Sequence, residues 1–368
     1  MTAAVLHIGT VKTGSTALQM WLSANPEILR GHGYHVSRSA GHTNHAGLVA
    51  FAQADGARDD VRARFAIGTP DDLARFRNRL IAELDAEVER AGALTFLFSS
   101  EFCHARLQTL AEIQALHALL GRWFDAIKVI VYLRRQDRVA VSGYTTLLAT
   151  GGIDVAIIPS APSGGSSQLD YFTTLDRWAR VFGDANLSIR LYDDAMRERG
   201  SVVADFCGQL GFTARLGDQP RVNVSLKPPH QELLRQLNLH WREAEGGGSK
   251  TGIGEIARLL KKFGAGPGRL PDRAAAEALY DRYRASNEAL RQRWFPDRAT
   301  LFDESFDDYP EHSAVPVLDA GTLLPMVAEL WSAVAQERTR MMKELVKSRR
   351  EIARLQSLVD GKGGRDPD

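Results

Sequence analysis

Short apolar runs without any alternation of polar and apolar positions recur through the first half of the chain. They occupy residues 5–8, 94–98 and 127–133, and a further run follows at 187–192. Strands that are apolar on both faces are typical of parallel sheets with helices packed on each side. Residues 33–36 predict one more short strand.

Helical patterns separate these runs. Residues 71–91 repeat apolar positions at helical spacing, with Asp71 or Asp72 suited to the N-cap, and residues 107–124 form a second such pattern. Strands and helices that alternate in this way predict an α/β fold with a parallel sheet flanked by helices. The chain opens with a strand, a loop and a helix, as in P-loop-type folds.

The second half of the chain is mostly helical in pattern. We expect three parts: an α/β core over residues 1–228, a helical extension packing on that core over residues 229–310, and a helical tail over residues 322–360. The tail is rich in Glu, Lys and Arg, and Leu345 and Ile352 belong to an apolar repeat of seven residues that continues to Val359. It is either an appended amphipathic helix or a helix through which the protein forms a homo-oligomer.

The composition narrows the range of functions. With 44% hydrophobic and 25% charged residues, it is typical of a soluble globular protein. A formal net charge of +1 excludes the broad basic surface of a nucleic-acid-binding protein, so any anion site must be local. Cys103 and Cys207 alone make no disulfide framework, and no apolar stretch has the length of a membrane span. We therefore expect a cytoplasmic protein, able to work at the inner membrane surface.

A phosphate-binding loop is predicted between the first strand and the first helix. Its sequence is Gly9-Thr10-Val11-Lys12-Thr13-Gly14-Ser15-Thr16. At such a junction, backbone N–H groups and the helix N-terminus converge on an anion, glycines allow close approach, and hydroxyls add donors. The spacing resembles the nucleotide triphosphatase pattern G-x-x-x-x-G-K-[ST], but the lysine is displaced to Lys12, before the second glycine. Lys12 could therefore reach across the loop to a bridging oxygen beside a transferred group.

A second anion site is predicted at the end of the most apolar strand. Arg134 follows that strand directly, and Ser142 lies on the helix predicted next. Ligands of parallel α/β sheets bind outside the carboxyl ends of the strands, where an arginine and a hydroxyl can hold one phosphate. We expect Arg135 and Arg138, in the same segment, to form surface ion pairs.

Residues 7–19 resemble the 5′-phosphosulfate-binding loop of sulfotransferases that use 3′-phosphoadenosine 5′-phosphosulfate (PAPS), especially the bacterial and carbohydrate-type members. The core of that loop, K-T-G-[ST]-T, is met at every position from Lys12 to Thr16. The spacing from Arg134 to Ser142 is similar to the family's 3′-phosphate element, although Arg135-Gln136-Asp137 stands where many members have Asp-Pro or Asn-Pro. The resemblance spans residues 5–300, and only the two phosphate elements are specific.

This resemblance implies transfer of a sulfuryl group from PAPS, without a metal, to an acceptor hydroxyl or amine, with a glycan or glycolipid as the favoured acceptor. It assigns the donor nucleotide to Lys12, Thr13, Gly14, Ser15, Thr16, Arg134 and Ser142. Two other functions fit such a loop. One is an ATP- and magnesium-dependent P-loop kinase, which the displaced lysine and the lack of a strand-terminal aspartate disfavour. The other is a non-catalytic binding module with the same fold.

Three residues are candidates for the base that accepts the acceptor's proton. Glu101 ends the third predicted strand on the edge where ligands bind, and His45 and His42 lie in the loop after the second strand. Glu101 could instead orient Lys12 or cap a helix, and the histidines could hydrogen-bond within their loop. We thus predict Lys12, Glu101 and His45 as the catalytic residues. His7, inside the first strand, is expected to be a packed core histidine.

Overall fold

The computed structural model describes residues 2–159, 166–213, 225–244 and 250–360. The chain forms two compact units. The first combines Met1–Gly143, Ala156–Asn223 and Leu270–Ser313, and the second combines Tyr144–Val155, Val224–Arg269 and Ala314–Asp368. Every residue predicted for the site belongs to the first unit.

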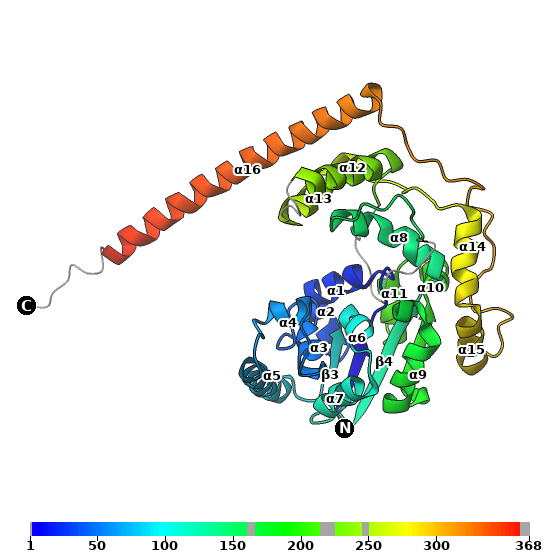
Figure 1. Ribbon diagram of the computed structural model, residues 1–368. Coiled ribbons are helices and arrows are strands. Elements are labelled where there is room, and N and C mark those ends of the chain that lie inside the picture. The colour runs from blue at the N-terminus through cyan, green and yellow to red at the C-terminus, as the bar shows by residue number, and fades with distance from the viewer. Residues whose placement is uncertain (1, 160–165, 214–224, 245–249, 361–368) are drawn as a thin grey trace, which may run out of the picture. The chain divides into compact units, whose positions relative to one another are not determined.

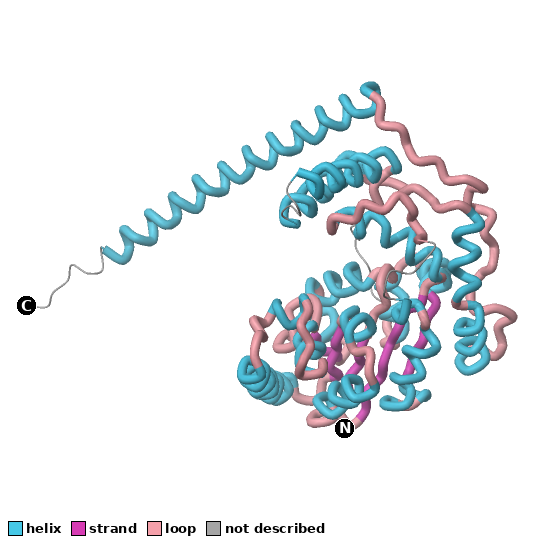
Figure 2. The backbone as a smooth tube through the Cα atoms, in the orientation of Figure 1, coloured by secondary structure: helices cyan, strands magenta, loops and turns pink. Residues whose placement is uncertain are grey.

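A five-stranded parallel sheet with the order β2-β3-β1-β4-β5 organises the first unit (Figures 1 and 2). Its strands are β1 (Ala3–His7), β2 (Tyr34–Val36), β3 (Thr95–Ser99), β4 (Ala126–Leu133) and β5 (Leu187–Leu191). His7 of β1 lies opposite Ser99 of β3 and Ile130 of β4. Because all five strands run the same way, their carboxyl ends meet at one edge.

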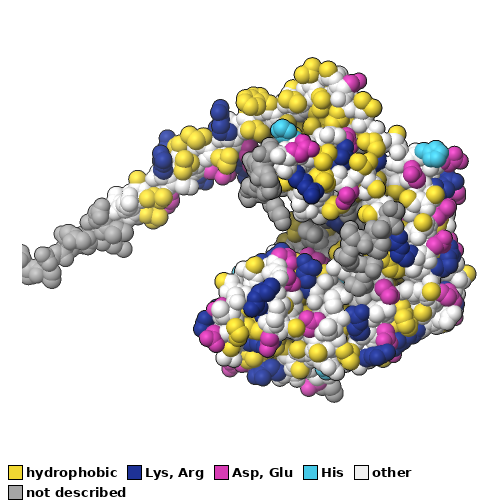
Figure 3. Space-filling view, in the orientation of Figure 1, with side chains coloured by type: hydrophobic (Ala, Val, Ile, Leu, Met, Phe, Trp, Pro, Cys, Tyr) yellow, Lys and Arg dark blue, Asp and Glu magenta, His cyan; other side chains and the backbone are white. Residues whose placement is uncertain are grey.

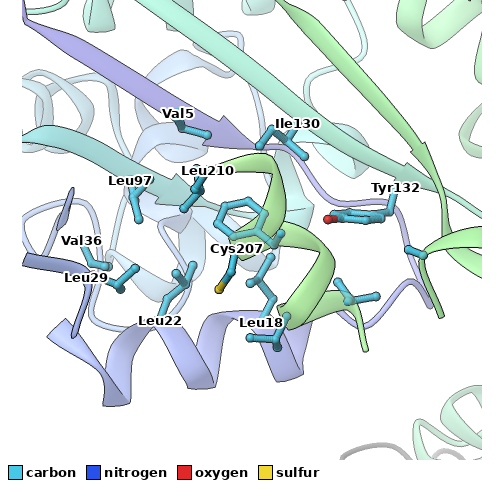
Figure 4. Close-up of a cluster of buried hydrophobic side chains, with 14 residues drawn as sticks. Val5, Leu18, Leu22, Leu29, Val36, Leu97, Ile130, Tyr132, Cys207 and Leu210 are labelled. Carbon is cyan, nitrogen blue, oxygen red and sulfur yellow. The ribbon is translucent and has the colours of Figure 1, made fainter. Parts of the chain in front are cut away.

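Helices cover both faces of this sheet. On one face, α1 (Ser15–Ala24) and α11 (Val202–Gln209) pack on the strands, and Leu18, Leu22 and Phe206 are buried against Val5 and Ile130 (Figure 4). Burial of each such side chain stabilises the fold by about 1.5–3 kcal/mol. This double coverage explains the unbroken apolar runs.

The alternate residues of the strands face the other side of the sheet. There the rings of Phe96 and Phe98 lie 5.1 and 5.9 Å from the ring of Phe124, measured between centroids. The helix α9 (Tyr171–Phe182) contacts β4 and β5, and α7 (Leu110–Leu120) packs on α9. The predicted α/β class, a P-loop-type parallel sheet flanked by helices, is confirmed.

The long helix α5 (Pro70–Ala91) begins slightly earlier than the sequence pattern predicts. Its N-cap is Thr69, not Asp71 or Asp72. The Thr69 hydroxyl accepts a hydrogen bond from the Asp72 backbone N–H, and the Asp72 carboxylate accepts one from the Thr69 backbone N–H. A capping box satisfies two otherwise unpaired donors, which is why the helix starts here.

Shorter helices complete the first unit's N-terminal portion. They are α2 (Pro26–Gly31), α3 (Ala46–Ala52), α4 (Asp60–Arg64), α6 (Glu101–Arg106) and α10 (Tyr192–Arg199), with 3₁₀ helices at Ser166–Leu169 and Asp184–Asn186. Of these, α6 and α10 begin directly after β3 and β5, so they start at the edge where the carboxyl ends of the strands meet.

The segment with α14 (Arg273–Arg282) and α15 (Arg284–Trp294) belongs to the first unit. The sequence predicts one helical extension over residues 229–310, whereas the structure divides these residues between the two units, at Leu270. Polar contacts give the reason: Gln136 Nε2 donates to Asn287 Oδ1 at 2.7 Å, and both side chains are buried. Ser286 Oγ likewise donates to an Asp170 oxygen at 2.6 Å. Buried polar groups require such partners.

The second unit is helical, as expected of the C-terminal part. It contains the last turns of α8 (Gln136–Ala149), together with α12 (Pro228–Ala244), α13 (Lys250–Gly264) and α16 (Ala320–Asp360). Asn238 of α12 donates to the carbonyls of Leu148 and Gly152, at 2.7 and 2.8 Å. Within the described residues, no helix combines the length and apolar character needed to cross a membrane, α16 included.

A buried carboxylate holds β2 and the following loop against α5. Glu87 accepts hydrogen bonds from His35 Nε2 at 2.9 Å, from the Ser37 hydroxyl at 2.8 Å and from the Arg38 backbone N–H at 2.7 Å. Burial by itself raises the pKa of Glu87, but the bonds from His35, Arg38 and Ser39 outweigh burial and lower this pKa from 4.5 to about 2.

Glu87→Gln is expected to lower the free energy of unfolding at neutral pH by about 2–3 kcal/mol, because a tenfold change in proton affinity corresponds to about 1.4 kcal/mol. A carboxylate with a lowered pKa stabilises the fold above its unfolded pKa of 4.5 and loses this contribution as the pH falls toward about 2. Urea denaturation should therefore show the difference shrinking upon acidification. Glu89→Gln, at an exposed position of the same helix, is the control. A difference that stays constant across this range would contradict the assignment.

Candidate functional site

The site forms where the carboxyl ends of four parallel strands meet. The predicted phosphate loop follows β1, Glu101 lies just after β3, Arg134 directly follows β4, and Tyr192 directly follows β5. Residues that are far apart in the chain are thereby brought to one edge, where ligands of parallel α/β sheets bind.

The loop's own hydroxyls hold its shape. Thr10 Oγ1 donates to the Tyr132 carbonyl of β4 at 2.6 Å, which ties the loop to the sheet. Thr13 Oγ1 donates to the Thr10 carbonyl at 2.8 Å, and Ser15 Oγ approaches the same oxygen at 3.4 Å. Thr13 and Ser15 are buried, whereas Thr16 is exposed. The sequence predicts these hydroxyls as ligand donors; in the structure those of Thr13 and Ser15 hydrogen-bond within the loop.

Left-handed backbone at Gly9 and Gly14 allows the loop to pack closely on its neighbours. Gly9 has φ +45°, and a Cβ atom there would lie 2.8 Å from Ser15 Oγ and 3.1 Å from Glu101 Cα. Gly14, with φ +79°, is the N-cap of α1 and makes no side-chain cap. The first N–H groups of α1 therefore have no capping side chain, which suits them to an anion.

Lys12 occupies a backbone conformation that is unusual for a residue other than glycine, with φ 63°. Its carbonyl oxygen accepts a hydrogen bond from Arg134 Nη1 at 3.2 Å. Its side chain runs toward α8, since a Cβ atom on Gly143 would lie 3.9 Å from Lys12 Cε. Ser142, the neighbour of Gly143, is half-buried. The structure thus brings Lys12, Arg134 and the Ser142 segment together.

Two tyrosines that the sequence analysis missed position Arg134. The Tyr171 hydroxyl donates to the Arg134 carbonyl at 2.7 Å, and the Arg134 guanidinium lies 4.8 Å from the centre of the Tyr192 ring. Cation–π contact of this kind orients an arginine without neutralising it. Asp193 is a weak partner, with its carboxylate oxygen 3.9 Å from Arg134 Nε. Tyr192 could have been found, because it ends a predicted strand; no sequence pattern marks Tyr171.

Glu101 lies beside the loop and is held by two amides. Its Oε2 atom accepts hydrogen bonds from Gln19 Nε2 at 2.6 Å and from Asn44 Nδ2 at 2.7 Å. Ser100 Oγ donates to Asn44 Oδ1 at 2.7 Å, which sets the orientation of that amide. Both bonds fall on one carboxylate oxygen of a half-buried side chain. The arrangement fixes Glu101 next to the loop.

His45 has a structural position. It is fully buried, its Nδ1 accepts a hydrogen bond from the Ser99 backbone N–H at 2.7 Å, and its Nε2 donates to the Ser37 carbonyl at 2.7 Å. Burial is the main cause that lowers its pKa, so the ring is neutral. With each nitrogen bound to backbone, His45 is poorly suited to proton transfer. His42, the third candidate, is exposed.

His7 is a core residue, as expected. Its side chain is fully buried, its Nδ1 lies 2.7 Å from Ser99 Oγ, and burial lowers its pKa to about 3. The ring packs edge-on against Tyr132 and Phe206. Among the described residues, no cluster of three or more His, Cys, Asp or Glu side chains has the arrangement of a metal site.

Arg135 and Arg138 form ion pairs, as expected, but the pair of Arg135 is buried and does not lie at the surface. Arg135 is buried and makes a two-pronged contact with Asp137, at 2.8 and 2.9 Å, and its Nη1 atom also donates to the Ser305 carbonyl at 2.7 Å. Arg138 pairs with Asp308 at 2.6 Å. Both side chains are therefore engaged in holding the segment together.

A polar cavity of about 580 Å³ opens beside Arg134. Its walls include Arg197 and Arg298, which both pair with Asp194, together with Leu191 and Phe302. The cavity leaves one side of the Arg134 guanidinium open, so an anion can approach this group from solvent.

No protein-family model matches the chain. An uncharacterized protein of Archaeoglobus fulgidus is 24% identical over 199 residues, which are 51% of this chain and 52% of the relative. The chain thus matches about half the length of that curated relative.

Several solved structures to which the chain is similar are sulfotransferases. One, from Alicyclobacillus acidocaldarius, is 14% identical, with a TM-score of 0.38 over 68% of this chain and 98% of that chain. The sulfotransferase domain of the Synechococcus PCC 7002 olefin synthase is 15% identical, with a TM-score of 0.32 over 77% and 94%. Retinol dehydratase in complex with androsterone and the inactive cofactor PAP is 11% identical, with a TM-score of 0.28 over 90% and 80%. Similarity at this level does not support a conclusion about activity, so the function must be inferred from the residues of the site.

Gly9→Ala is expected to destabilise the fold by about 1–3 kcal/mol, because a side chain at φ +45° is strained and would collide with Ser15 Oγ and the Glu101 backbone. Urea denaturation measures this change. Gly31→Ala is the matched control: Gly31 lies in α2 and a Cβ atom there meets no heavy atom within 4 Å. That control should change stability by no more than about 0.5 kcal/mol. Equal effects of the two substitutions would argue against a tightly packed loop.

Proposed function

We propose that this chain is a PAPS-dependent sulfotransferase that moves a sulfuryl group to a hydroxyl or amine of an acceptor. The observation that carries the proposal is that two cationic residues, Lys12 and Arg134, lie close together after the neighbouring strands β1 and β4. Lys12, displaced from its position in nucleotide triphosphatases, has its carbonyl bound by Arg134 Nη1 at 3.2 Å. A donor with two separate anionic groups, a 5′-phosphosulfate and a 3′-phosphate, needs two cationic sites at a fixed separation.

The residues of the site fit this donor. The uncapped N-terminus of α1 and the backbone N–H groups of residues 13–16 would bind the 5′-phosphosulfate, together with the Lys12 ammonium. Arg134 and Ser142 would bind the 3′-phosphate. Arg134 suits this role because its guanidinium is oriented by the Tyr192 ring and open to the neighbouring cavity.

The reaction breaks the bond between sulfur and the oxygen that bridges to the 5′-phosphate, and it forms a bond between sulfur and the acceptor oxygen or nitrogen. Negative charge grows on the bridging oxygen as it leaves. Lys12 would stabilise this charge, and the α1 N-terminus would stabilise the phosphate to which it belongs. The acceptor's proton passes to a base. No metal ion takes part in the proposed reaction.

Glu101 is the base that we propose. Its carboxylate is fixed beside the loop by Gln19 and Asn44, and one oxygen receives both of these bonds. Because both bonds fall on Oε2, the second carboxylate oxygen can accept a hydrogen bond from the acceptor's hydroxyl or amine. We infer a structural role for His45, because both of its ring nitrogens are bound to backbone groups.

A glycan or glycolipid hydroxyl is the acceptor that we propose, on the strength of the loop's resemblance to bacterial and carbohydrate-type sulfotransferases.

Isothermal calorimetry with adenosine 3′,5′-bisphosphate, against ATP with magnesium, tests the proposal. The bisphosphate should bind tightly without magnesium, and ATP at least about 100-fold more weakly, because only the bisphosphate matches both cationic sites. Preferential binding of magnesium-ATP would replace the sulfotransferase with a kinase. Failure to bind either nucleotide would favour a non-catalytic module.

Arg134→Ala is expected to weaken binding of adenosine 3′,5′-bisphosphate about 10- to 100-fold, since a charge-assisted hydrogen bond contributes about 1.5–3 kcal/mol. Binding of adenosine 5′-phosphosulfate, which lacks the 3′-phosphate, should weaken much less, because it loses only the support that Arg134 gives to the Lys12 carbonyl. Arg197→Ala is the control, because Arg197 lines the same cavity and its side chain is 72% exposed. Equal losses for both nucleotides would remove Arg134 from the 3′-phosphate site.

Glu101→Gln is expected to reduce turnover about 10²- to 10⁴-fold while leaving bisphosphate affinity unchanged, because the amide keeps the shape but cannot take a proton. Initial rates of PAPS consumption at saturating donor and acceptor give the turnover. His45→Gln is the comparison: it should lower the unfolding free energy and leave turnover per folded molecule unaltered. Normal turnover in Glu101→Gln would clear this residue of the role.

A further inference from the structure

A long stretch of α16 packs on nothing in the described part of its own unit. All residues from 338 to 357 are exposed, including Met341, Leu345, Ile352 and Leu355. Figure 3 shows apolar and basic side chains side by side along this helix. An amphipathic helix of this kind gains most of its stability from packing, so its apolar face calls for a partner.

The exposed apolar residues of α16 follow a heptad repeat. Steps of three and four residues alternate along one line, which we call the seam; it consists of Leu324, Val327, Trp331, Val334, Arg338, Met341, Leu345, Ser348, Ile352 and Leu355. Every apolar residue in this set is exposed. A heptad seam sustained over more than four repeats is typical of a coiled coil.

The contact that α16 makes within its own unit lies on a different face. Met326 and Ala333 are buried, and Glu337 pairs with Lys262 of α13 at 2.9 Å and with Arg258 at 3.2 Å. These three residues of α16 stand outside the seam. The helix can therefore keep α13 on one side and receive another helix on the seam.

The charged residues beside the seam favour one orientation of a second helix packed on it. Glu344 and Glu351 stand just before seam residues, on one flank, and Arg349 stands on the other flank. In a parallel pair, Glu344 of one helix faces Arg349 of the other; in an antiparallel pair, acidic flanks would face each other. Glu344 also contacts Arg340 of its own helix at 3.2 Å. A carboxylate has two oxygens, so Glu344 can pair with Arg340 and with Arg349 of the other helix at the same time.

The positions of the Lys and Arg residues of α16 argue against a membrane surface as the partner of the seam. Helices that lie in a membrane interface have Lys and Arg beside the apolar stripe, at the level of the headgroups. In α16 the basic residues lie mainly on the face opposite the seam, at Arg340, Lys343, Lys347, Arg350 and Arg354. Beside the seam, Glu344 and Glu351 occupy one flank, where anionic lipid would repel them, and Arg349 is the cation on the other flank.

We propose that α16 pairs with α16 of a second copy of this chain, in a parallel and in-register two-stranded coiled coil. The apolar residues of the seam interlock between the copies, and Arg338 and Ser348 are the polar seam positions that set the register. This proposal is independent of the sulfotransferase function, because it rests on the tail helix alone.

A pair of adjacent substitutions tests the seam. Leu345 and Val346 are each 45% exposed in the single chain, but only Leu345 belongs to the seam. Leu345→Glu should raise the dimer dissociation constant at least about 100-fold, because each dimer would bury two unpaired carboxylates, and Val346→Glu should change it by less than about threefold. Sedimentation equilibrium of the full chain measures both values. Equal effects would overturn the proposal, as would a wild-type chain that stays monomeric at about 100 µM.

Cysteine substitutions test the parallel, in-register order. Ser348→Cys places a thiol in the seam, where it meets its counterpart only if the helices are parallel and in register. Ser357→Cys places one on the far face as the matched control, and the native Cys103 and Cys207 are buried. Mild oxidation should link the Ser348→Cys chains within minutes and leave the control chains largely unlinked. Absence of linking in a dimer would overturn the parallel order; a monomer that binds phosphatidylglycerol vesicles would assign the seam to membranes.

Discussion

The parallel register of the five strands is the constraint on which the site depends. Because β1 lies between β3 and β4, the predicted phosphate loop is flanked by Glu101 on one side and Arg134 on the other. Tyr192 joins them only because β5 pairs with β4 in the same direction. A slip of one residue in any strand would turn its buried side chains to the opposite face, so apolar packing on both faces maintains this alignment.

Hydrogen bonds and close packing hold the loop in place. Thr10 ties it to β4, Thr13 closes it on itself, and the glycines at 9 and 14 let Glu101 and α11 approach it closely. Arg134 has two roles here, since it binds the Lys12 carbonyl and presents its guanidinium to a cavity. The two proposed anion sites are therefore mechanically joined, and a donor that bridges them would meet a preformed geometry.

Several polar side chains near the site form hydrogen bonds or ion pairs within the fold. Fewer side chains are therefore candidates for catalysis or ligand binding. Arg135 is buried and pairs with Asp137, His45 is bound by backbone on both sides, and Glu87 holds the β2 loop through three or more donors. A buried charge or ring nitrogen without a partner is unfavourable, so these groups must be satisfied within the fold. Of the residues proposed for the ligand, Arg134 lines a cavity at the edge of the sheet.

The amino-acid sequence by itself determined the strands, the α/β class, the loop with Lys12, and the placement of Arg134 after a strand, because these follow from local apolar patterns and from chain order. Only the tertiary structure decided which candidates have free groups. His45 and Thr13 carry suitable side chains, but their hydrogen bonds to Ser37, Ser99 and Thr10 depend on which segments meet in space. Tyr171 likewise reaches the Arg134 carbonyl from 37 residues away, and the segment Leu270–Ser313 joins the α/β unit through contacts that no local pattern encodes. Secondary-structure propensity depends on a few neighbouring residues, whereas the hydrogen-bond partners of buried polar groups depend on which distant segments the tertiary fold brings together.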